Sequence, residues 1–388
     1  MGHKFLAPSA AHIWGKPGGC TMYPQVAAAF PDLSSPEAEE GEASHEIGAE
    51  LIDAGTRAQF PDWKVFEGRV ASNGVPFTHE MYVGAKLYAD NVINVMRDHG
   101  VFGGEGLRVE QYVDIPRVHI DQNGGTPDCS LWAKQQGFLY VWDYKFGFDV
   151  VEAFENWQMM DYVAGLLDLH DINGHADQYT HVVLRVVQPR APHRKGPIRE
   201  WTVLASDLRG YINQMANNAG EATGPGATAR TGSHCKHCPG RHACEPAIRA
   251  GVSMFEASGV SLPMQPSPAA MGAYKSYLDR AYEHIKSLRE GFTTQMVAAI
   301  KRGEVVPGWT TEPTYGRQTW ARPDAEVIML GQMLGKDLAK PPQAITPNQA
   351  RNLGIDPALI KQYSTQGQTG FKLAPDDGQQ AREAFSNE

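Results

Sequence analysis

The chain has 388 residues, of which 42% are hydrophobic, and this is enough for a buried core in one large domain or two smaller ones. Its net charge of −9 argues mildly against nucleic acid as a partner, because contacts to phosphates need Lys and Arg. The charge is uneven: residues 31–53 hold eight acidic residues and no Lys or Arg, whereas residues 181–250 hold ten Lys or Arg and four acidic residues. An acidic chain of this kind can still present a basic surface.

Apolar runs in the sequence stay short of the ~20 residues that a membrane span needs. The first residues also lack the apolar core of a signal peptide. We therefore expect no membrane contact and a cytoplasmic location.

The first half of the chain predicts two helices and then a set of strands. Ser34-Ser35-Pro36-Glu37 is typical of a helix start, and this helix should run to about Asp53. Apolar residues at helical spacing predict a second helix over residues 80–99. Strands are then predicted at residues 107–115, 138–144, 179–187 and 198–204, with helices at residues 150–169 and 206–216. This order favours an α/β fold with a central mixed β-sheet flanked by helices.

The composition changes after the last of these strands. Residues 217–232 are mostly Gly, Ala, Thr and Asn, which predicts a mobile loop. A long amphipathic helix is predicted over residues 271–301, followed by a strand around residues 314–320 and by short helices. We expect one domain over residues 1–250 and a mainly helical extension over residues 251–388 that packs on it or binds a partner.

Two short stretches of the sequence carry reactive groups. Thr126-Pro127-Asp128 follows a Gly124-Gly125 turn signal, and Asp143 and Lys145 stand at the end of an apolar strand, two residues apart and so on one side of it. If the two segments pair as neighbouring strands, the two carboxylates repel each other unless a cation lies between them. Mg²⁺ or Mn²⁺ suits such oxygen ligands, and Lys145 could orient or deprotonate a water and offset charge on a phosphate.

The cysteines suggest a second metal site. There are five, and Cys235, Cys238 and Cys244 lie within ten residues of one another. In a cytosolic chain such crowding favours a metal over a disulfide. These three supply three of four tetrahedral positions, and Cys20 is the natural candidate for the fourth.

Pro127-Asp128 followed by Asp143-Tyr144-Lys145 resembles the core motif of the PD-(D/E)xK nucleases. The resemblance implies a restriction-endonuclease-like core. It also implies that Asp128, Asp143 and the backbone carbonyl of Tyr144 hold one or two divalent ions, and that Lys145 is catalytic. Many members have either Asp or Glu at the second acidic position, so Asp143 leaves the chemistry unaffected.

Further motifs resemble the RecB-type members of that superfamily. Those members carry a His on an N-terminal helix as a further metal ligand, and the segment around His45 resembles that helix; an imidazole shifts the preference toward Mn²⁺. Gln158 and Tyr162 share one helical face and look like the Gln-xxx-Tyr motif that meets DNA near the scissile phosphate. Glu110, on the preceding strand, is a further candidate for the metal site, with an exposed strand carboxylate as the alternative.

One N-terminal cysteine followed by a C-terminal trio resembles the iron-sulfur staple of AddB-type and CRISPR-adaptation nucleases. There a structural [4Fe-4S] cluster ties the two ends of the chain around the nuclease core. We favour this cluster over zinc because Cys20 would otherwise lack a role, while His234, His237 and His242 keep Zn²⁺ open as the alternative. Cys129 is most simply a buried strand thiol.

The resemblance covers about residues 10–250 and implies a metal-dependent deoxyribonuclease, expected to be an exonuclease acting on a free DNA end. Pro307-Gly308-Trp309 and the segment 316–320 resemble phage-encoded proteins of this class. Phage DNA recombination, repair or processing, a phage recombination protein as partner and the host cytoplasm follow from that resemblance. The rival interpretations are a non-cleaving DNA-binding or assembly protein on the same fold and a zinc-ribbon DNA-binding protein.

Overall fold

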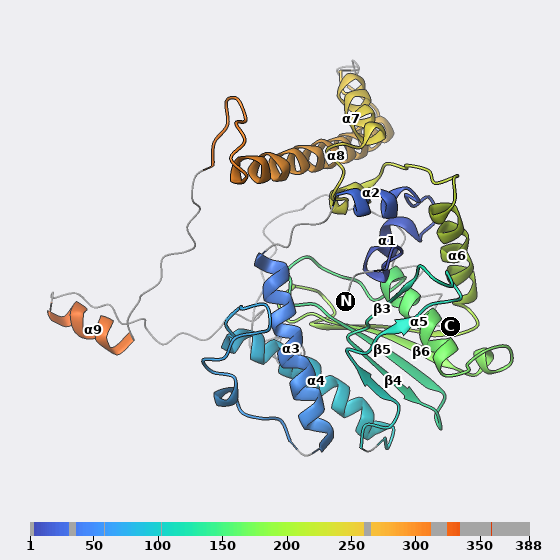
Figure 1. Cartoon of the computed structure of the whole chain (residues 1–388), viewed down its shortest axis with the longest axis vertical. Helices are drawn as coiled ribbons and strands as arrows, with labels where there is room; N and C mark the ends of the chain where they lie inside the picture. The colour runs from blue at the N-terminus through green and yellow to red at the C-terminus, as the bar shows by residue number, and fades with distance from the viewer. Residues whose placement is uncertain are drawn as a thin grey trace.

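A computed structural model describes residues 4–30, 36–57, 59–101, 103–259, 265–311, 324–333 and 358. Its centre is a five-stranded sheet in the order β1-β4-β5-β6-β7, with helices on both faces (Figure 1). The β5–β6 pair is parallel and the other neighbouring pairs are antiparallel. The predicted α/β class with a central mixed sheet is therefore confirmed.

The strands of the sheet are β1 (Leu107–Val109), β4 (Cys129–Ala133), β5 (Phe138–Tyr144), β6 (His181–Val187) and β7 (Ile198–Leu204). A separate two-stranded ribbon pairs β2 (Val113–Asp114) with β3 (Gly124–Gly125). A parallel pair needs a crossover connection, and α5 (Trp157–Leu169) supplies it between β5 and β6. Because β5 and β6 are parallel, their carboxyl-terminal residues, Tyr144 and Val187, lie next to each other at the same end of the sheet.

Each face of the sheet has its own core because strand residues alternate between the faces. On β5, Val141 belongs to one core and Trp142 to the other. The face of Val141 is covered by α1 (Ala11–Trp14), α5 and α6 (Arg209–Thr223), and the face of Trp142 by α3 (Pro36–Arg57) and α4 (His79–Asp98) (Figure 1). Asp143 follows Val141 by two residues and therefore points to the side of α5.

Two helices differ from their predicted bounds. α5 begins at Trp157 rather than near residue 150, because the side chain of Asn156 accepts a 3.1 Å hydrogen bond from the N–H of Met159 and caps the helix there. α6 begins at Arg209 and continues to Thr223, so residues 217–223 are helical and the predicted loop is wrong there. Buried small side chains let this turn pack against the N-terminal segment, which compensates for its low helix propensity.

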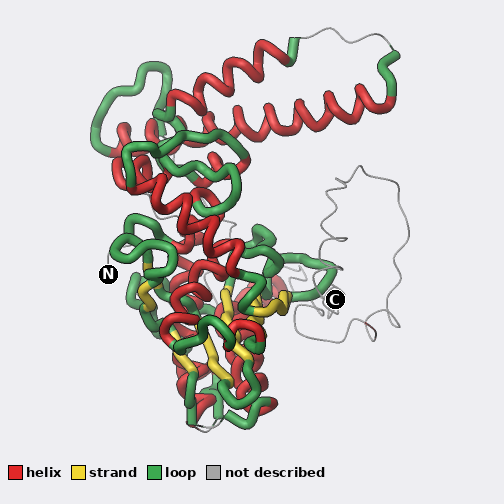
Figure 2. The backbone as a smooth tube through the Cα atoms, turned by 90° about the vertical axis from the view of Figure 1, so that its right-hand side faces the viewer, coloured by secondary structure: helices red, strands yellow, loops and turns green. Residues whose placement is uncertain are grey.

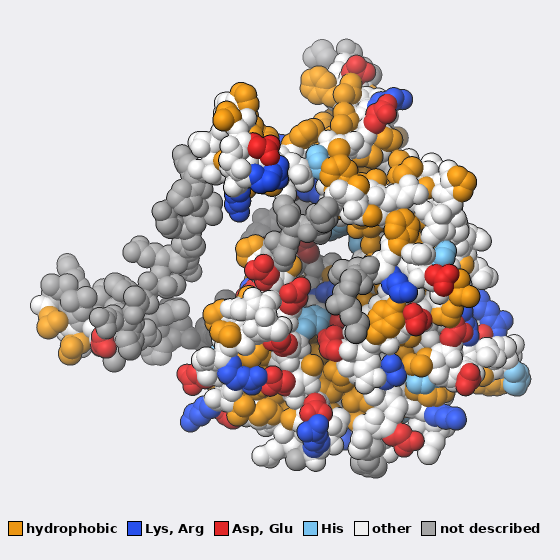
Figure 3. All heavy atoms as spheres, viewed as in Figure 1, with side chains coloured by type: hydrophobic (Ala, Val, Ile, Leu, Met, Phe, Trp, Pro, Cys, Tyr) orange, Lys and Arg blue, Asp and Glu red, His pale blue; other side chains and the backbone are white. Residues whose placement is uncertain are grey.

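The C-terminal part of the described chain is helical, as predicted. α7 (Glu245–Ala257) and the 34-residue α8 (Pro268–Lys301) project from the sheet as an arm (Figure 2). Figure 3 shows hydrophobic side chains on the surface of this arm. The predicted division at residue 250 falls inside α7 and stays a prediction.

The remaining elements are α2 (Tyr23–Ala29), α9 (Asp324–Met333) and four short 3-10 helices, η1 (Pro8–Ala10), η2 (Trp63–Val65), η3 (Ala176–Gln178) and η4 (Ser233–His237). The strand predicted around residues 314–320 and the Ser34-Ser35 cap lie outside the described residues. Within the described part of the chain, no helix combines the length and the apolar character that crossing a membrane requires.

Candidate metal centre

The β4–β5 hairpin brings the two predicted aspartates together. Cys129 pairs with Trp142, so Asp128 stands opposite Asp143 where the two strands reach the sheet edge. The backbone N–H of Tyr144 donates a hydrogen bond of 2.6 Å to Oδ2 of Asp128 and holds that carboxylate at the end of β5. The predicted pairing of the two acidic segments is therefore confirmed.

His45 reaches the same edge from α3. Its Nδ1 lies 3.6 Å from Oδ1 of Asp128 and 3.4 Å from Oε1 of Glu110. One ligand atom from each of these three residues lies within 4.8 Å of the others, which is the spacing that a single cation needs. Glu110, the further candidate, thus joins the site, while Asp143 stands beside this group of three.

The position of Glu110 depends on an unusual backbone conformation. The sequence predicts one strand over residues 107–115, but the strand breaks at Glu110, whose φ is +46°. Its N–H donates to the backbone carbonyl of Asp128 at 3.0 Å, which ties the break to the site. A left-handed non-glycine residue is strained, and such residues cluster at functional sites.

Asp143 connects the metal ligands to Lys145 and α5. Its Oδ1 lies 2.8 Å from Nζ of Lys145 and accepts a 3.2 Å hydrogen bond from Nε2 of Gln158. The other oxygen, Oδ2, is buried and has no hydrogen-bond partner within the described residues. Because a buried carboxylate oxygen without a partner costs free energy, this atom is a natural ligand for a cation.

The two tyrosines of the predicted site are largely buried. The hydroxyl of Tyr144 lies 2.8 Å from Oγ of Ser44, one residue before His45, and thereby fixes α3 against the sheet. Tyr162 packs against Gly125, where a Cβ would lie 3.1 Å from its ring, and it shares a hydrogen bond with Gln158. A metal contact of the Tyr144 carbonyl and a DNA contact of Gln158 and Tyr162 stay predictions.

Burial and charge set the protonation of this site. Burial raises the pKa values of Asp128 and Asp143, and the neighbouring cations oppose that rise without cancelling it. Burial lowers the pKa of Lys145, but Asp143 and Asp128 outweigh it and the pKa is raised. The pKa of His45 is likewise raised, because Asp128 and Glu110 overcome its burial. Without a metal, a proton on His45 therefore offsets part of the acidic charge.

The four cysteines of the predicted cluster, Cys20, Cys235, Cys238 and Cys244, line one pocket between the N-terminal segment and η4. All are free thiols. Burial raises the pKa values of three of them, Cys238 to about 11, and neighbouring thiols contribute to each rise. The structure thus brings Cys20 to the distant trio.

Hydrogen bonds from α6 hold Cys20 in this pocket. Asn218 donates from its amide to the carbonyls of Trp14, Gly15 and Lys16, and Glu221 accepts a 2.8 Å hydrogen bond from the hydroxyl of Thr21. The sequence does not single out either residue, because the composition of this part of α6 predicts a loop. A buried amide able to bond several carbonyls leaves no periodic signal in a sequence.

The histidines of the zinc alternative are placed less favourably. His234 lines the pocket, but its Nε2 lies 2.8 Å from the backbone oxygen of Arg230. His237 contacts the ring of His12, and His242 the ring of Phe30. Cys129 is fully buried at the start of β4, as expected.

The basic stretch over residues 181–250 is largely neutralised by the fold. Five of its arginines pair with acidic side chains: Arg185, Arg190, Arg209, Arg230 and Arg249. Arg199 and Arg241 donate to backbone carbonyls. These residues therefore do not form a continuous, unpaired basic surface.

A family model described as "Protein of unknown function (DUF2800)" matches residues 3–340. The matched range contains every residue of the candidate metal centre and all four cysteines of the pocket. The description names no activity.

Proposed function

The chain belongs to the DUF2800 family, and we propose that it is a metal-dependent deoxyribonuclease of the PD-(D/E)xK type. One observation carries the proposal: His45, Asp128 and Glu110 offer three ligand atoms at cation spacing, beside the unpartnered Oδ2 of Asp143. A lysine next to such a group of ligands suits metal-assisted phosphodiester hydrolysis. The proposed substrate is DNA with a free end.

The donor set suits Mg²⁺ or Mn²⁺. Three carboxylates supply hard oxygen ligands, and one imidazole favours Mn²⁺ of the two. His45, Asp128 and Asp143 would hold the ion, with Glu110 and the carbonyl of Tyr144 completing the site. An ion held by these residues would lower the pKa of a water and balance negative charge on the phosphate.

The protein groups around the ion have separate tasks. Lys145 is charged, because its pKa is raised, and it is part-exposed beside Asp143, so it can orient the attacking water and offset negative charge on the phosphate. Gln158 holds the Asp143 carboxylate from the side of α5. Tyr162, bonded to Gln158, keeps that amide in place, and we propose that this pair also borders the path of the DNA strand.

For the cysteine pocket we propose a structural [4Fe-4S] cluster. The support is that Cys20, Cys235, Cys238 and Cys244 line one pocket, so that four thiolates are available to one centre, as an iron-sulfur cluster requires. A single Zn²⁺ on the same thiolates is the alternative. The role of the cluster would be to tie the N-terminal segment to η4.

The resemblance to phage-encoded nucleases carries the biological setting. We propose action in phage DNA recombination, repair or processing, in the host cytoplasm and with a phage recombination protein as partner. These parts rest on analogy with that class.

The decisive experiment is a cleavage assay on linear DNA labelled at the 5′ or 3′ end and on circular DNA, with Mn²⁺, Mg²⁺ or EDTA. We expect cleavage of the linear substrates with Mn²⁺ or Mg²⁺ and none with EDTA, and no cleavage by Asp128→Asn. DNA binding without cleavage under every condition would reject the nuclease in favour of a DNA-binding protein. Cleavage that survives in Asp128→Asn would reject the site.

A further inference from the structure

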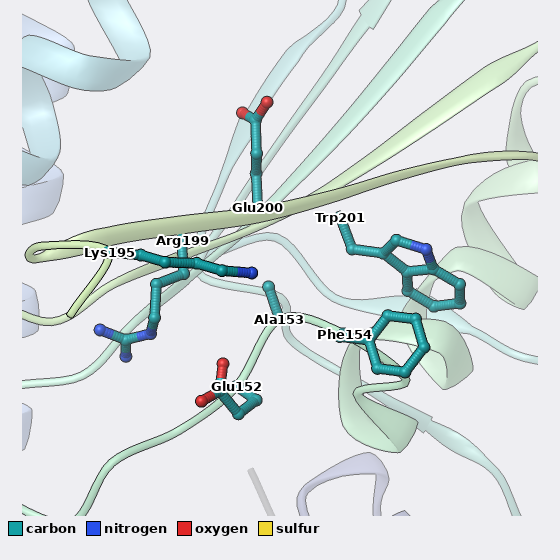
Figure 4. A pocket seen from close by; sticks show the side chains of 7 residues that line it. All are labelled: Glu152, Ala153, Phe154, Lys195, Arg199, Glu200 and Trp201. Carbon is teal, nitrogen blue, oxygen red and sulfur yellow. The ribbon is translucent and has the colours of Figure 1, made fainter. Parts of the chain in front are cut away.

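The polar pocket beside β7 is lined by charged side chains that already have partners. Figure 4 shows Arg199 and Glu152 on the same side of β7, with Glu200 on the opposite side. Arg199 donates to the carbonyl of Val151. Oε1 of Glu152 lies 3.0 Å from Nε2 of His193, and Glu200 pairs with an arginine of β6. These groups are satisfied from within the fold, in contrast to the apolar side chains on the arm.

The arm is a hairpin in which α7 and α8 lie side by side (Figure 2). Nε2 of His284 lies 2.7 Å from the carbonyl oxygen of Ala247, and the hydroxyl of Tyr277 donates to the carbonyl of Met254. The higher-numbered residue of α7 thus meets the lower-numbered residue of α8. The two helices are therefore antiparallel.

α8 carries a stripe of exposed apolar side chains. Met271, Leu278, Ile285 and Phe292 recur every seven residues and are 37–50% exposed, and Tyr282 beside them is 65% exposed. Side chains that repeat every seven residues stay on one side of a helix, and this is the spacing by which one helix packs along another. We call these five residues the α8 stripe.

α7 carries a shorter stripe, formed by Ile248, Val252 and Phe255, which are 38–72% exposed. Ile248 follows Ala247 by one residue, just as Ile285 follows His284, and Ala247 and His284 are the residues in contact. One residue turns a helix by about 100°. Because the helices are antiparallel, this turn brings both stripes to the same side of the plane through the two helix axes. The arm therefore has one apolar face.

This apolar face is turned away from the cysteine pocket. The buried Ser287 faces that pocket, and its carbonyl accepts a 2.9 Å hydrogen bond from Arg241. Ser287 follows Ile285 by two residues, which is about 200° around the helix, so the two side chains point in nearly opposite directions. The apolar face is therefore accessible to another molecule, and an exposed apolar patch of this kind is typical of a protein-binding surface.

We propose that the apolar face of the arm binds a second copy of this chain, in a dimer whose two α8 helices pack antiparallel. A two-fold dimer uses the same surface on both copies, so that surface must be complementary to itself. The repeat on α8 is centred next to Tyr282. A two-fold axis at this point sets Leu278 against the partner's Ile285, and Met271 against the partner's Phe292.

The same axis also serves α7. The contacts of Tyr277 with Met254 and of His284 with Ala247 place the centre of the α7 stripe level with residues 279–280 of α8. This point is about 3 Å along the helix from the centre of the α8 stripe. One two-fold axis therefore pairs α7 with α7 and α8 with α8. Pairing α8 with α7 instead would leave both ends of the longer stripe uncovered.

The area is sufficient for a dimer. The face extends roughly 30 Å along α8 and 20 Å along α7, and each helix is about 10 Å wide, which gives roughly 500 Å² on each copy. The two copies together would bury about 1,000 Å², the size at which specific interfaces begin. An apolar composition is typical of interfaces between identical chains.

Sedimentation velocity of the full chain at micromolar concentrations tests the dimer. We expect a wild-type mass of twice 42.5 kDa. Ile285→Asp places a charge in the interface from both copies, so association should weaken about a hundredfold and the monomer should predominate. Thr294→Asp is the matched control, because Thr294 is exposed on the opposite side of α8 from Phe292, and it should remain dimeric. Circular dichroism checks folding, and Leu278→Asp replaces Ile285→Asp if that variant does not fold.

Cross-linking with a short bismaleimide tests the antiparallel arrangement. Tyr282→Cys lies next to the two-fold axis and should be joined to its own copy, whereas Met271→Cys should not, because the two copies of that residue are roughly 30 Å apart. The wild type, with five native cysteines, measures the background. A monomeric wild type, or a dimer that persists in both Ile285→Asp and Leu278→Asp, would overturn the proposal. Equal cross-linking of Met271→Cys and Tyr282→Cys would overturn the antiparallel arrangement. None of these measurements depends on the proposed nuclease activity.

Discussion

The N–H of Tyr144 donates to one oxygen of Asp128 while the other oxygen of that carboxylate faces His45 at 3.6 Å. The end of β5 therefore fixes both acidic groups. Asp143 is itself part of the strand, and the backbone N–H of Tyr144, the residue after it, holds Asp128. A change in the pairing of β4 with β5 would therefore also move the proposed metal ligands. The hydrogen bond from Tyr144 orients the Asp128 carboxylate, as hydrogen bonds to metal-binding side chains do at known metal sites.

Metal binding at this site should release a proton. Asp128 and Glu110 outweigh burial and raise the pKa of His45 above its ordinary value, so below that raised pKa the imidazole carries a proton that a metal must displace. We expect Mn²⁺ affinity to increase as pH rises through that pKa, with about one proton released per ion below it. Calorimetry in buffers of different ionisation enthalpy measures both quantities. A pH-independent affinity would contradict the role of His45.

Lys145→Ala should abolish cleavage while leaving DNA binding near normal. The amine is expected to act on the water and the phosphate during the reaction, so its loss should weaken binding of the transition state far more than binding of the DNA itself. Loss of the 2.8 Å contact leaves Asp143 less compensated, so folding is compared by thermal unfolding with Mn²⁺ present. Lys64→Ala, a surface cation on η2, is the control. Cleavage retained in Lys145→Ala would refute the assignment.

Glu110→Gly should make the folded chain more stable and lower its affinity for Mn²⁺. A left-handed φ of +46° strains a residue with a Cβ, and glycine removes about 1 kcal/mol of that strain. The lost contact to His45 is part-exposed and contributes little stability. Urea unfolding without metal and Mn²⁺ calorimetry give the two quantities.

Asp171→Gly is the matched control, because Asp171 has a φ of +55° in the turn after α5. It should show the gain in stability without a change in Mn²⁺ affinity. If Glu110→Gly bound Mn²⁺ with the same affinity as Asp171→Gly, Glu110 would not be a metal ligand.

Asp161→Asn should stabilise the chain by an amount that grows with pH. Asp161 is fully buried, and burial raises its pKa to about 8, against which only hydrogen bonds from Asn123 act. The folded state thus holds a proton that the unfolded state loses near pH 4, so the wild type loses up to about 1.4 kcal/mol per pH unit between these values. The amide variant has no such dependence. Urea unfolding at pH 5, 6.5 and 8 tests this, and a constant difference would show that Asp161 does not titrate.

Cys20→Ser should remove the chromophore of the freshly purified protein. If the cluster is iron-sulfur, the wild type is brown and contains iron, and losing one of four thiolates weakens its attachment. Cys129→Ser is the control, because that thiol lies on β4, away from the pocket. A colourless wild type containing zinc would support the zinc alternative instead. Colour retained in Cys20→Ser would separate Cys20 from the cluster.

The strand β5 and the α/β class could be predicted because local patterns encode them, whereas β4 was not predicted as a strand and its pairing with β5 was only a condition for joining the two acidic segments. A run of apolar and aromatic residues predicts β5, and the Gly-Gly turn signal before Pro127-Asp128 places that acidic segment where it can pair with β5. His45 could be placed on a helix for the same reason. These features need only the period of a strand or helix and the chemistry of the side chains.

The features that the sequence did not reveal depend on contacts between distant segments. The break at Glu110 carries no glycine to mark it, and the hydrogen bond from its N–H to the carbonyl of Asp128, on another strand, holds it at the site. The last turn of α6 has a loop-like composition, and Asn218 stabilises it only by reaching the carbonyls of the N-terminal segment. The neutralisation of the basic stretch likewise needs acidic partners from other elements, such as Glu40 for Arg190. Propensity is a weak guide where tertiary contacts of this kind decide.

Arg241 joins the cysteine pocket to the arm. It donates from Nη1 to the carbonyl of Cys238 and from Nε to the carbonyl of Ser287, inside α8. α8 has 34 residues and is therefore roughly 50 Å long, so a small tilt at Ser287 becomes a large displacement at its tip. Oxidation of the thiols would accordingly change the orientation of α8 and move its ends, far from the sulfur atoms.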